Sequence, residues 1–326
     1  MKNGGGVVYL AYKLSDKKYF RVNNIIEYDK NKNFIFKLLY KIFGSNNLLK
    51  WQVRKINPVI TILECSNDLK ILKNNKSKKI LVQHQKFENE MKILFFNEEE
   101  INKIKKEIDC FVCLSDYDRD RFIKELDFPK DKIRTIRHSC EVELRKTHKE
   151  KNKELIIISR LENIQKRLDL AIKGMVKLKD FKLKIWGDGL DKEKYKDLIE
   201  EYKLEDRVFL MGPTNKVQEK LDESGIFIMT SDYEGYPIAL IEAMRRGLPI
   251  VLRNMFDAAQ DIVVNNQNGI LLEKEWNEDK FVEAVKKIYN NYEYYSENSR
   301  KLGERYNFEI IQKKWEDLAN DLLQGE

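Results

Sequence analysis

Short apolar runs alternate with longer charged segments along most of the chain. The runs in the first half are VVYLAY (7–12), PVITILE (58–64), KILVQH (79–84), CFVCLS (110–115) and IRTIRH (133–138). The runs in the second half are ELIIIS (154–159), LKIWG (183–187), RVFLMG (207–212), IFIMTS (226–231) and PIVLR (249–253). Helix-length amphipathic segments such as LDKEKYKDLIEEYKL separate the later runs. Strands that alternate with helices predict parallel sheets built from β-α-β units.

A charged segment without periodicity, EVELRKTHKEKNK (141–153), lies between two of the predicted strands. Because 326 residues is long for a single core, we expect a domain boundary in this segment. The prediction is two parallel-sheet domains of similar size. The last segment, YNFEIIQKKWEDLANDLLQ, predicts an amphipathic helix that can pack on either domain.

Composition and cysteine spacing predict a cytoplasmic protein without a metal site. No apolar run approaches the roughly 18 residues that a membrane span needs. The start, MKNGGGVVYL, lacks the pattern of a signal peptide. Cys110 and Cys113 form a C-x-x-C inside a predicted buried strand, where residues three apart face opposite sides. The three histidines show no ligand spacing, so we expect no metal.

Positive charge is concentrated in the first half of the chain. Residues 1–150 carry 32 Lys and Arg against 21 Asp and Glu, whereas the remaining residues carry 29 against 33. A basic half can face an anionic membrane surface or substrate, but solvated surface lysines explain it equally well. The segment NFIFKLLYKIFG (33–44) is compatible with a helix lying on a bilayer surface. A core helix with one wet stripe, holding Lys37 and Lys41, is slightly favoured.

Two acids surround a predicted helix start in SDYEGYPIALIEAMRRGLPIVL (231–252). Pro237 suits the first helical position, and Gly247 can end the helix in the left-handed conformation. The helix start offers free N–H groups to a phosphate. Glu234 lies at this start and Glu242 lies further along, and carboxylates accept hydrogen bonds from neighbouring hydroxyls. Such an arrangement suits a nucleotide sugar, which has a diphosphate between two polyols.

Cations follow another predicted strand of the same domain. Arg160 ends the run ELIIIS, and we expect Lys166 and Arg167 to open the next helix. Cations that reach a common point could clamp a diphosphate and stabilise it as a leaving group. The loop WGDGL (186–190) also follows a strand and allows a close approach of the backbone to a ligand. Ligands of parallel sheets bind at these carboxyl strand ends.

The sequence from Leu155 to Leu272 resembles the retaining glycosyltransferases of family 4, which have the GT-B fold. The matching motifs, in order, are SRL with the following KR, WGDG, VFLMG, IFIMTS, EGYPIALIEAMRRGLPIV and NNQNGILL. The E-x7-E pair followed by EAM-x-x-G-L-P-I-V is the most specific part. The resemblance implies an α/β protein of two Rossmann-like parallel-sheet domains that face a central cleft. Residues 1–150 would bind the acceptor and residues 151–305 the nucleotide sugar, with the helix at about 306–326 packing back on the first domain.

The resemblance also assigns roles to individual residues. Arg160 and Lys166 would contact the diphosphate, Glu242 the ribose hydroxyls and Glu234 the transferred sugar. His84 would line the cleft between donor sugar and acceptor as a further catalytic residue. The other expected donor contacts are Gly187, Gly212, Pro213 and Thr214, the last three near the base, and the backbone of Gly235, Tyr236, Pro237 and Ile238. Gly5 and Gly6 would form a phosphate-proximal loop, although here they come almost at the start, where the family's leading strand is missing or very short.

The resemblance implies a retaining transfer of a hexosyl unit from a nucleotide sugar to a hydroxyl group. We expect a UDP-linked donor, no metal or other cofactor, and a glycan or lipid-linked acceptor in bacterial surface polysaccharide or glycoconjugate synthesis. The expected location is the cytoplasm, with peripheral contact to an anionic inner membrane face. The alternatives are a nucleotide-sugar epimerase, a protein-acceptor glycosyltransferase and a noncatalytic nucleotide- or nucleic-acid-binding module. We expect no nucleic acid partner, because the positive charge lies mainly outside the domain that carries the motifs.

Overall fold

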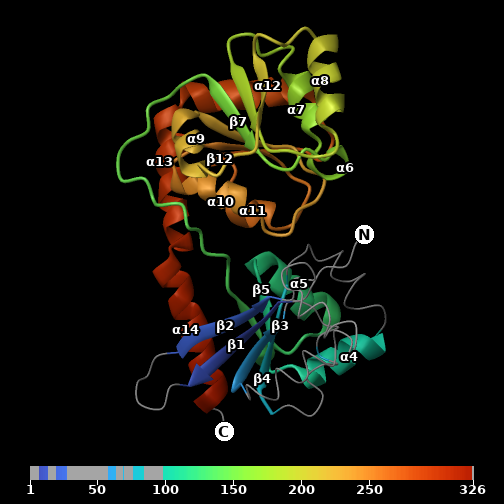
Figure 1. The fold of residues 1–326 in the computed structure, drawn as a ribbon, viewed down its shortest axis with the longest axis vertical. Coiled ribbons are helices and arrows are strands. Elements are labelled where there is room, and N and C mark those ends of the chain that lie inside the picture. The colour runs from blue at the N-terminus through green and yellow to red at the C-terminus, as the bar shows by residue number, and fades with distance from the viewer. Residues whose placement is uncertain are drawn as a thin grey trace, which may run out of the picture. The chain divides into compact units, whose positions relative to one another are not determined.

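The chain forms two compact units in the computed structural model. The structure describes residues 7–13, 20–27, 58–63, 69, 76–83 and 98–324, the first two ranges as backbone. One unit contains residues Met1–Ile136 and Gln312–Glu326, and the other contains residues Arg137–Ile311. Each unit is built on a six-stranded sheet (Figure 1).

The sheet of the first unit has the order β2-β1-β3-β4-β5-β6. Its strands are β1 (Val7–Lys13), β2 (Phe20–Glu27), β3 (Ile60–Leu63), β4 (Lys78–Val82), β5 (Cys110–Cys113) and β6 (Ile133–Thr135). Strands β3 to β6 are parallel, whereas β1 pairs antiparallel with both β2 and β3. The strand predicted at residues 7–12 is confirmed. The sequence analysis missed β2.

The described helices of the first unit are α4 (Glu98–Glu107), α5 (Asp116–Leu126) and the short η2 (Lys130–Lys132). Helix α5 begins after Ser115, whose Oγ accepts a hydrogen bond from the Asp118 N–H at 3.0 Å. In the core, the ring of Phe111 on β5 contacts the rings of Phe122 and Phe128. Cys110 and Cys113 are buried free cysteines of β5, so the prediction of a buried strand at the C-x-x-C is confirmed.

The sheet of the second unit is parallel throughout and has the order β12-β11-β10-β7-β8-β9. Its strands are β7 (Glu154–Ile158), β8 (Lys182–Trp186), β9 (Val208–Gly212), β10 (Ile226–Met229), β11 (Ile250–Arg253) and β12 (Gly269–Leu272). The order of the chain reverses between β7 and β10, the first and fourth strands of this unit. Parallel sheets bind ligands in the crevice beyond the carboxyl ends of the strands at such a switch point.

Helices cover both faces of this sheet (Figure 1). On one face, α7 contacts α8 and α12, and on the other face, α10 contacts α9 and α13. The bounds are α6 (Asn163–Lys166), α7 (Leu168–Gly174), α8 (Lys192–Glu201), α9 (Val217–Glu223), α10 (Ile238–Arg245), α11 (Ala259–Ile262), α12 (Glu278–Asn290), α13 (Tyr292–Gly303), η3 (Glu304–Tyr306) and α14 (Phe308–Gln324). All residues of β10 and β11 are buried, as expected for strands covered on both faces. The predicted class, an α/β protein of two Rossmann-like domains, is confirmed.

The charged segment between the two sheets is bonded to the second unit. The Arg145 N–H donates to the carbonyl of Arg245 at 2.8 Å, and Lys149 Nζ donates to the carbonyl of Asp222 at 2.7 Å. The division by contacts therefore falls earlier, between Ile136 and Arg137, and it assigns Gln312–Glu326 to the first unit. The domain limits 1–150 and 151–305 stay predictions.

None of the helices in the described part of the chain is both long and apolar enough to cross a membrane. Residues 33–44, the candidate membrane-surface segment, lie outside the described residues. Contact with an anionic surface therefore stays a prediction.

Candidate functional site

Three predicted site residues follow the two strands that flank the switch point. Arg160 comes two residues after the end of β7, and Lys166 is the last residue of the short helix α6. Glu234 lies in the loop between β10 and α10. The parallel pairing of β7 with β10 brings the carboxyl ends of both strands to the same edge of the sheet.

Hydrogen bonds join these three residues through Gln165. Lys166 Nζ donates to Glu234 Oε1 at 2.7 Å, and Gln165 Nε2 donates to Glu234 Oε2 at 3.3 Å. The amide oxygen of Gln165 accepts a hydrogen bond from Arg160 Nη2 at 2.9 Å. We call Arg160, Gln165, Lys166 and Glu234 the switch-point cluster. The sequence analysis did not single out Gln165, because an isolated glutamine carries no motif.

The cluster combines a buried ion pair with an exposed guanidinium. The side chains of Lys166 and Glu234 are 13% and 9% exposed, whereas that of Arg160 is 61% exposed. A buried ion pair has lost most of its hydration, so the loss of one partner leaves the other charge uncompensated. Arg160 is also paired with Glu162 at 2.8 Å, in an exposed position where ion pairs are weak. Arg160 can therefore turn to an anionic ligand at little cost.

The helix after β7 differs from the prediction. Lys166 ends α6 instead of opening a helix, and Arg167 adopts a left-handed conformation with φ of 50°. This conformation costs a non-glycine residue about 1–2 kcal/mol. The guanidinium of Arg167 forms ion pairs with Asp169 at 3.1 Å and with Asp232 at 3.3 Å. Arg167 therefore does not join the switch-point cluster.

The loop that carries Glu234 is bonded to the backbone of α6. The Asp232 N–H donates to the carbonyl of Gln165 at 2.8 Å, and Thr230 Oγ1 donates to the carbonyl of Lys166 at 3.0 Å. The Asp232 carboxylate also accepts a hydrogen bond from Arg253, the last residue of β11. These contacts hold the two loops at the switch point together, which sets Glu234 beside Lys166.

The start of α10 is shifted by one residue from the prediction. Pro237 precedes the helix, with φ of −71° and an extended ψ of 113°, and Ile238 is the first helical residue. The extended ψ keeps Pro237 outside the helix, while its carbonyl accepts a hydrogen bond from the Leu240 N–H at 3.2 Å. The predicted end is confirmed, because Gly247 follows the helix with φ of 74°.

Glu242 lies on α10 apart from the switch-point cluster. Among the described residues it makes no hydrogen bond or ion pair with Arg160, Lys166 or Glu234. Burial and then the nearby charge of Glu141 raise the pKa of Glu242 above its usual value. The proximity of Glu141 shows that the segment leading into the second unit packs near this carboxylate. A ribose contact of Glu242 stays a prediction.

The glycine loop after β8 packs against the loop after β7. Gly187 has φ of 142°, and a Cβ atom there would lie 1.8 Å from the carbonyl oxygen of Ser159. A Cβ atom at Gly189 would lie 2.5 Å from the carbonyl oxygen of Leu161. Both glycines therefore allow the backbones of two neighbouring loops to meet at the carboxyl edge. The predicted approach of Gly187 to a ligand stays a prediction.

The remaining predicted donor residues occupy several positions. Gly212 has φ of 77° and borders open space, and Thr214 Oγ1 accepts a hydrogen bond from the Lys216 N–H at 3.0 Å. The side chain of Tyr236 is buried, so this residue can offer its backbone to a ligand. His84, Gly5 and Gly6 lie outside the described residues.

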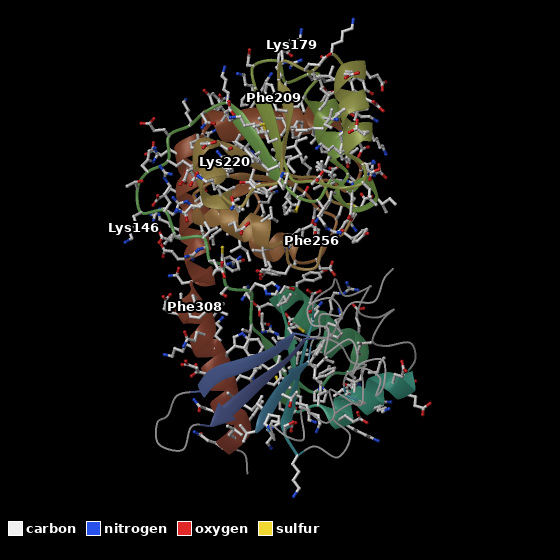
Figure 2. The ribbon with its side chains drawn as sticks, viewed as in Figure 1. Lys146, Lys179, Phe209, Lys220, Phe256 and Phe308 are labelled. Carbon is white, nitrogen blue, oxygen red and sulfur yellow. The ribbon has the colours of Figure 1, made fainter. Side chains whose placement is uncertain are left out.

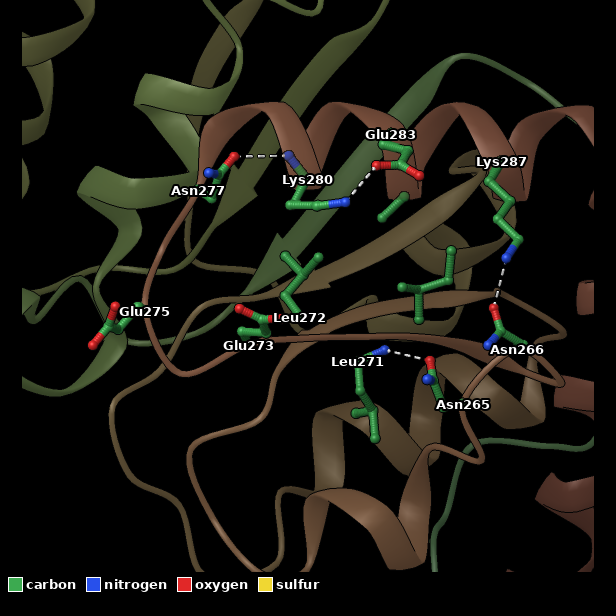
Figure 3. Close-up of a pocket in the computed structure, with 12 residues that line it drawn as sticks. Asn265, Asn266, Leu271, Leu272, Glu273, Glu275, Asn277, Lys280, Glu283 and Lys287 are labelled. Carbon is green, nitrogen blue, oxygen red and sulfur yellow. Dashed lines mark hydrogen bonds and ion pairs between the residues drawn. The ribbon is translucent and has the colours of Figure 1, made fainter.

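A groove of about 250 Å³ lies elsewhere in the second unit, between β12 and α12 (Figure 3). Both of its lysines have partners, since Lys280 pairs with Glu283 at 3.2 Å and Lys287 Nζ donates to Asn266 Oδ1 at 2.8 Å. None of the predicted site residues lines it. It lies along the edge strand of the sheet and away from the switch point.

The fold and the switch-point cluster together define a Rossmann-type unit with cations and a carboxylate at the carboxyl edge of its sheet. Residues 141–305 of the 326 match the protein family described as "Glycosyl transferases group 1". The chain belongs to this family.

Two curated relatives match part of the chain at about one-third identity. An uncharacterized glycosyltransferase of Haemophilus influenzae is 35% identical over 145 residues, which cover 44% of this chain and 41% of the relative. The poly(ribitol-phosphate) alpha-N-acetylglucosaminyltransferase of Staphylococcus aureus is 32% identical over 201 residues, covering 59% of this chain and 40% of the relative. The chain thus spans about two fifths of the length of these relatives.

A solved structure of TarM from S. aureus is similar to most of the chain. It is a mutant in complex with fondaparinux, alpha-GlcNAc-glycerol and UDP. The likeness has a TM-score of 0.69 and 26% identity, and it covers 84% of this chain and 58% of TarM. The GT-B fold expected from the resemblance is confirmed.

Proposed function

We propose that this protein is a retaining glycosyltransferase of family 4. It moves a hexosyl unit from a UDP-linked sugar to a hydroxyl group of a glycan or lipid-linked acceptor in bacterial surface polysaccharide or glycoconjugate synthesis. It needs no metal ion and works in the cytoplasm, at the inner membrane face. The curated relative named as a poly(ribitol-phosphate) alpha-N-acetylglucosaminyltransferase supports an acceptor that belongs to a cell-surface polymer.

One observation carries the proposal, which is the contact of Lys166 Nζ with Glu234 Oε1 at the switch point. The contact joins residues 68 positions apart, from the two loops where a parallel sheet of this order binds its ligand. A cation next to a carboxylate can bind the two groups that separate when a nucleotide sugar reacts, the diphosphate and the sugar. The phosphate side needs positive charge, and the sugar side needs acceptors for hydroxyl protons.

Lys166 and Arg160 take the electrostatic role in this mechanism. The acceptor oxygen attacks the anomeric carbon on the face that the diphosphate leaves, so the configuration is retained. The bond between the anomeric carbon and the phosphate oxygen breaks, and that phosphate takes the proton of the acceptor hydroxyl. Negative charge grows on the leaving diphosphate, where preorganised cations lower the barrier.

Glu234 orients the transferred sugar. Its carboxylate is held by Lys166 and Gln165, so its remaining lone pairs have a fixed direction. A fixed acceptor of this kind binds sugar hydroxyls without losing freedom at the moment of reaction. Glu242 is assigned to the ribose hydroxyls, the backbone of residues 235–238 to the diphosphate, and residues 212–214 to the base.

The test is a comparison of Glu234→Gln and Lys166→Met with a matched control, Lys149→Met. Lys149 is a buried lysine of the same unit, 3% exposed, whose Nζ donates to a carbonyl away from the switch point. Purified proteins are incubated with a panel of UDP-sugars and acceptors, and released UDP and glycosylated product are measured. We expect each site variant to lose transfer about 100-fold or more. The control should keep its rate per folded molecule.

Three outcomes would contradict the proposal. If Glu234→Gln and Lys166→Met transfer sugar at the wild-type rate, neither residue has the role that we propose. Conversion of the donor into another nucleotide sugar in the absence of acceptor, without UDP release, would identify an epimerase. Binding of UDP without any product across the acceptor panel would indicate a noncatalytic nucleotide-binding module.

A further inference from the structure

A buried polar cluster lies next to the loop that carries Glu234. Tyr236 Oη donates to Asp261 Oδ2 at 2.7 Å and lies 2.7 Å from Tyr306 Oη. Arg137 holds both oxygens of the Asp261 carboxylate, with Nε to Oδ2 at 2.8 Å and Nη2 to Oδ1 at 2.5 Å. We call Arg137, Tyr236, Asp261 and Tyr306 the tyrosine cluster.

The hydrogen bonds of the tyrosine cluster have one direction. A hydroxyl donates one proton, and that of Tyr236 goes to the Asp261 carboxylate, which can only accept. Tyr306 must therefore donate to Tyr236, and Arg305 Nη2 in turn donates to Tyr306 Oη at 3.0 Å. Burial raises the pKa of both tyrosines above the usual value, so their hydroxyls keep these protons. The chain of donors ends on Asp261.

Three other segments of the second unit meet the loop of Tyr236 at the tyrosine cluster. Arg137 is the first residue of the unit, Asp261 belongs to α11, and Tyr306 ends η3. Tyr236 and Tyr306 are 5% and 0% exposed, and the side chains of Arg137 and Asp261 are each 11% exposed. Because these groups are shielded from water and paired, they fix the tyrosine ring in one position.

Glu234 lies midway between two fixed points of its loop. Two residues before it, Asp232 is bonded to Arg253 at the end of β11 and to the carbonyl of Gln165. Two residues after it, Tyr236 is bonded to Asp261. Asp232, which precedes Glu234, is bonded to the switch-point cluster, and Tyr236, which follows Glu234, belongs to the tyrosine cluster. The backbone of Glu234 is thus determined by one anchor on each side.

We propose that Tyr236 and Asp261 are positioning residues for the donor sugar, acting through Glu234. This inference rests on the proposed function, because it assigns Glu234 to the sugar and not to the nucleotide. Loss of the Tyr236 hydroxyl frees one end of the Glu234 loop. The loop must then become ordered when a sugar binds, and because this ordering costs free energy, the sugar binds more weakly. The base contacts and the cations Arg160 and Lys166 lie on other loops, and only the backbone of residues 235–238 shares this loop. The binding of UDP should therefore weaken less than the binding of the UDP-sugar.

The test compares Tyr236→Phe with Tyr292→Phe. Tyr292 is 3% exposed and donates to the carbonyl of Gly225, just before β10, at the opposite end of the strand from the site. Both variants lose one buried hydroxyl, so a purely structural role predicts similar losses of thermal stability and no change in ligand preference. Calorimetry then measures the Kd of UDP and of the preferred UDP-sugar for both variants and the wild type.

We expect Tyr236→Phe to weaken UDP-sugar binding about 10-fold while the Kd of UDP stays within about two-fold. Tyr292→Phe should leave both constants unchanged. If Tyr236→Phe does not fold, Asp261→Asn provides the second variant and should show the same split. Equal shifts of both ligands, no shift, or the same split in Tyr292→Phe would overturn the inference. A wild-type protein that binds neither ligand would overturn the proposed function itself, and the positioning role with it.

Discussion

Two charged clusters of the second unit use the same kinds of side chain in different ways. The switch-point cluster lies at the carboxyl edge of the sheet. A second cluster, the amino-edge cluster, consists of Arg145, Lys149, Asp222 and Arg246 and lies where α9 leads into the start of β10. The Asp222 carboxylate accepts from Arg145 at 2.9 Å and from Arg246 at 2.9 and 2.8 Å.

The difference lies in what the cations hold. In the amino-edge cluster, Arg246 also donates to the carbonyl of Glu143 at 2.7 Å, and Lys149 donates to the carbonyl of Asp222 at 2.7 Å. These cations tie the segment 142–149 to the unit. In the switch-point cluster, the guanidinium of Arg160 and the amine of Lys166 are bonded to side chains. The amino-edge cations are held by backbone carbonyls as well as by the Asp222 carboxylate, and these backbone contacts are part of the fold. The partners in the switch-point cluster are side chains, which can be exchanged for a ligand.

Burial alone does not separate the two roles. Lys146 points outward from the same segment (Figure 2), while Lys149, three residues later, is buried. A basic sequence such as RKTHKEK therefore contains both solvated and structural cations. Position relative to the carboxyl strand ends, together with the type of partner, identifies the candidate ligand-binding cations.

The largest expected effect is on stability at the amino edge. Asp222→Ala leaves Arg145 and Arg246 without their shared carboxylate, and their side chains are 22% and 9% exposed. We expect a loss of about 3 kcal/mol in the free energy of unfolding, measured by urea denaturation. Transfer per folded molecule should stay at the wild-type rate. If Asp222→Ala is as stable as the wild type but inactive, the amino-edge cluster has a role in activity and not in stability.

The second prediction concerns pH and the buried amine of Lys149. Burial, and then the nearby charge of Arg145, lower the pKa of Lys149 from 10.5 to about 8 in the folded protein. Between these two values the unfolded chain keeps a proton that the folded protein releases, so the free energy of unfolding rises with pH. Below pH 8 both states are protonated, and the full cost of burying the charge remains.

The measurement for Lys149 is a comparison with Lys149→Met, which lacks the titrating group. Urea unfolding at pH 7.5 and pH 10 should show the wild type gaining about 2 kcal/mol on the variant as the pH rises. Both proteins share all other titrating groups, so these cancel in the difference. A constant difference between the two proteins would show that the Lys149 amine keeps its usual pKa.

The smallest expected effect on stability is at Arg160, where the effect on activity should nevertheless be large. The guanidinium is 61% exposed, so Arg160→Ala should change the free energy of unfolding by at most about 0.5 kcal/mol. Loss of a cation at the leaving diphosphate should lower kcat about 100-fold. Arg160→Lys keeps the charge and should recover part of the rate. If Arg160→Ala is fully active, Arg160 does not stabilise the leaving diphosphate, and Lys166 alone keeps this role.

Much of the second unit and part of its site were predictable from the sequence. The central strands are short apolar runs between helices, and parallel strands bring their carboxyl ends to one edge. Residues in the loops after these strands, such as Arg160 and Glu234, are therefore expected at the same edge of the sheet. Lys166 reaches the same edge at the end of the short helix α6, eight residues after the end of β7.

The missed features depend on contacts between residues far apart in the sequence. The left-handed Arg167 is bonded to Asp232, 65 positions away, and the local sequence predicted instead that Lys166 and Arg167 open a helix. Gln165 and Asp261 carry no motif and gain their meaning from the loops that they touch. Strand β2, FRVNNIIE, contains two asparagines, which are rare in strands, and pairing with β1 overrides this preference.

The most direct test of the account is hydrogen exchange of the backbone amides with and without UDP. The central claim is that the switch point between β7 and β10 binds the nucleotide sugar. We predict that saturating UDP slows exchange in residues 159–168 and 231–242 and leaves the groove segments 265–275 and 278–287 unchanged. Protection confined to the groove, or no protection in either region, would contradict the claim.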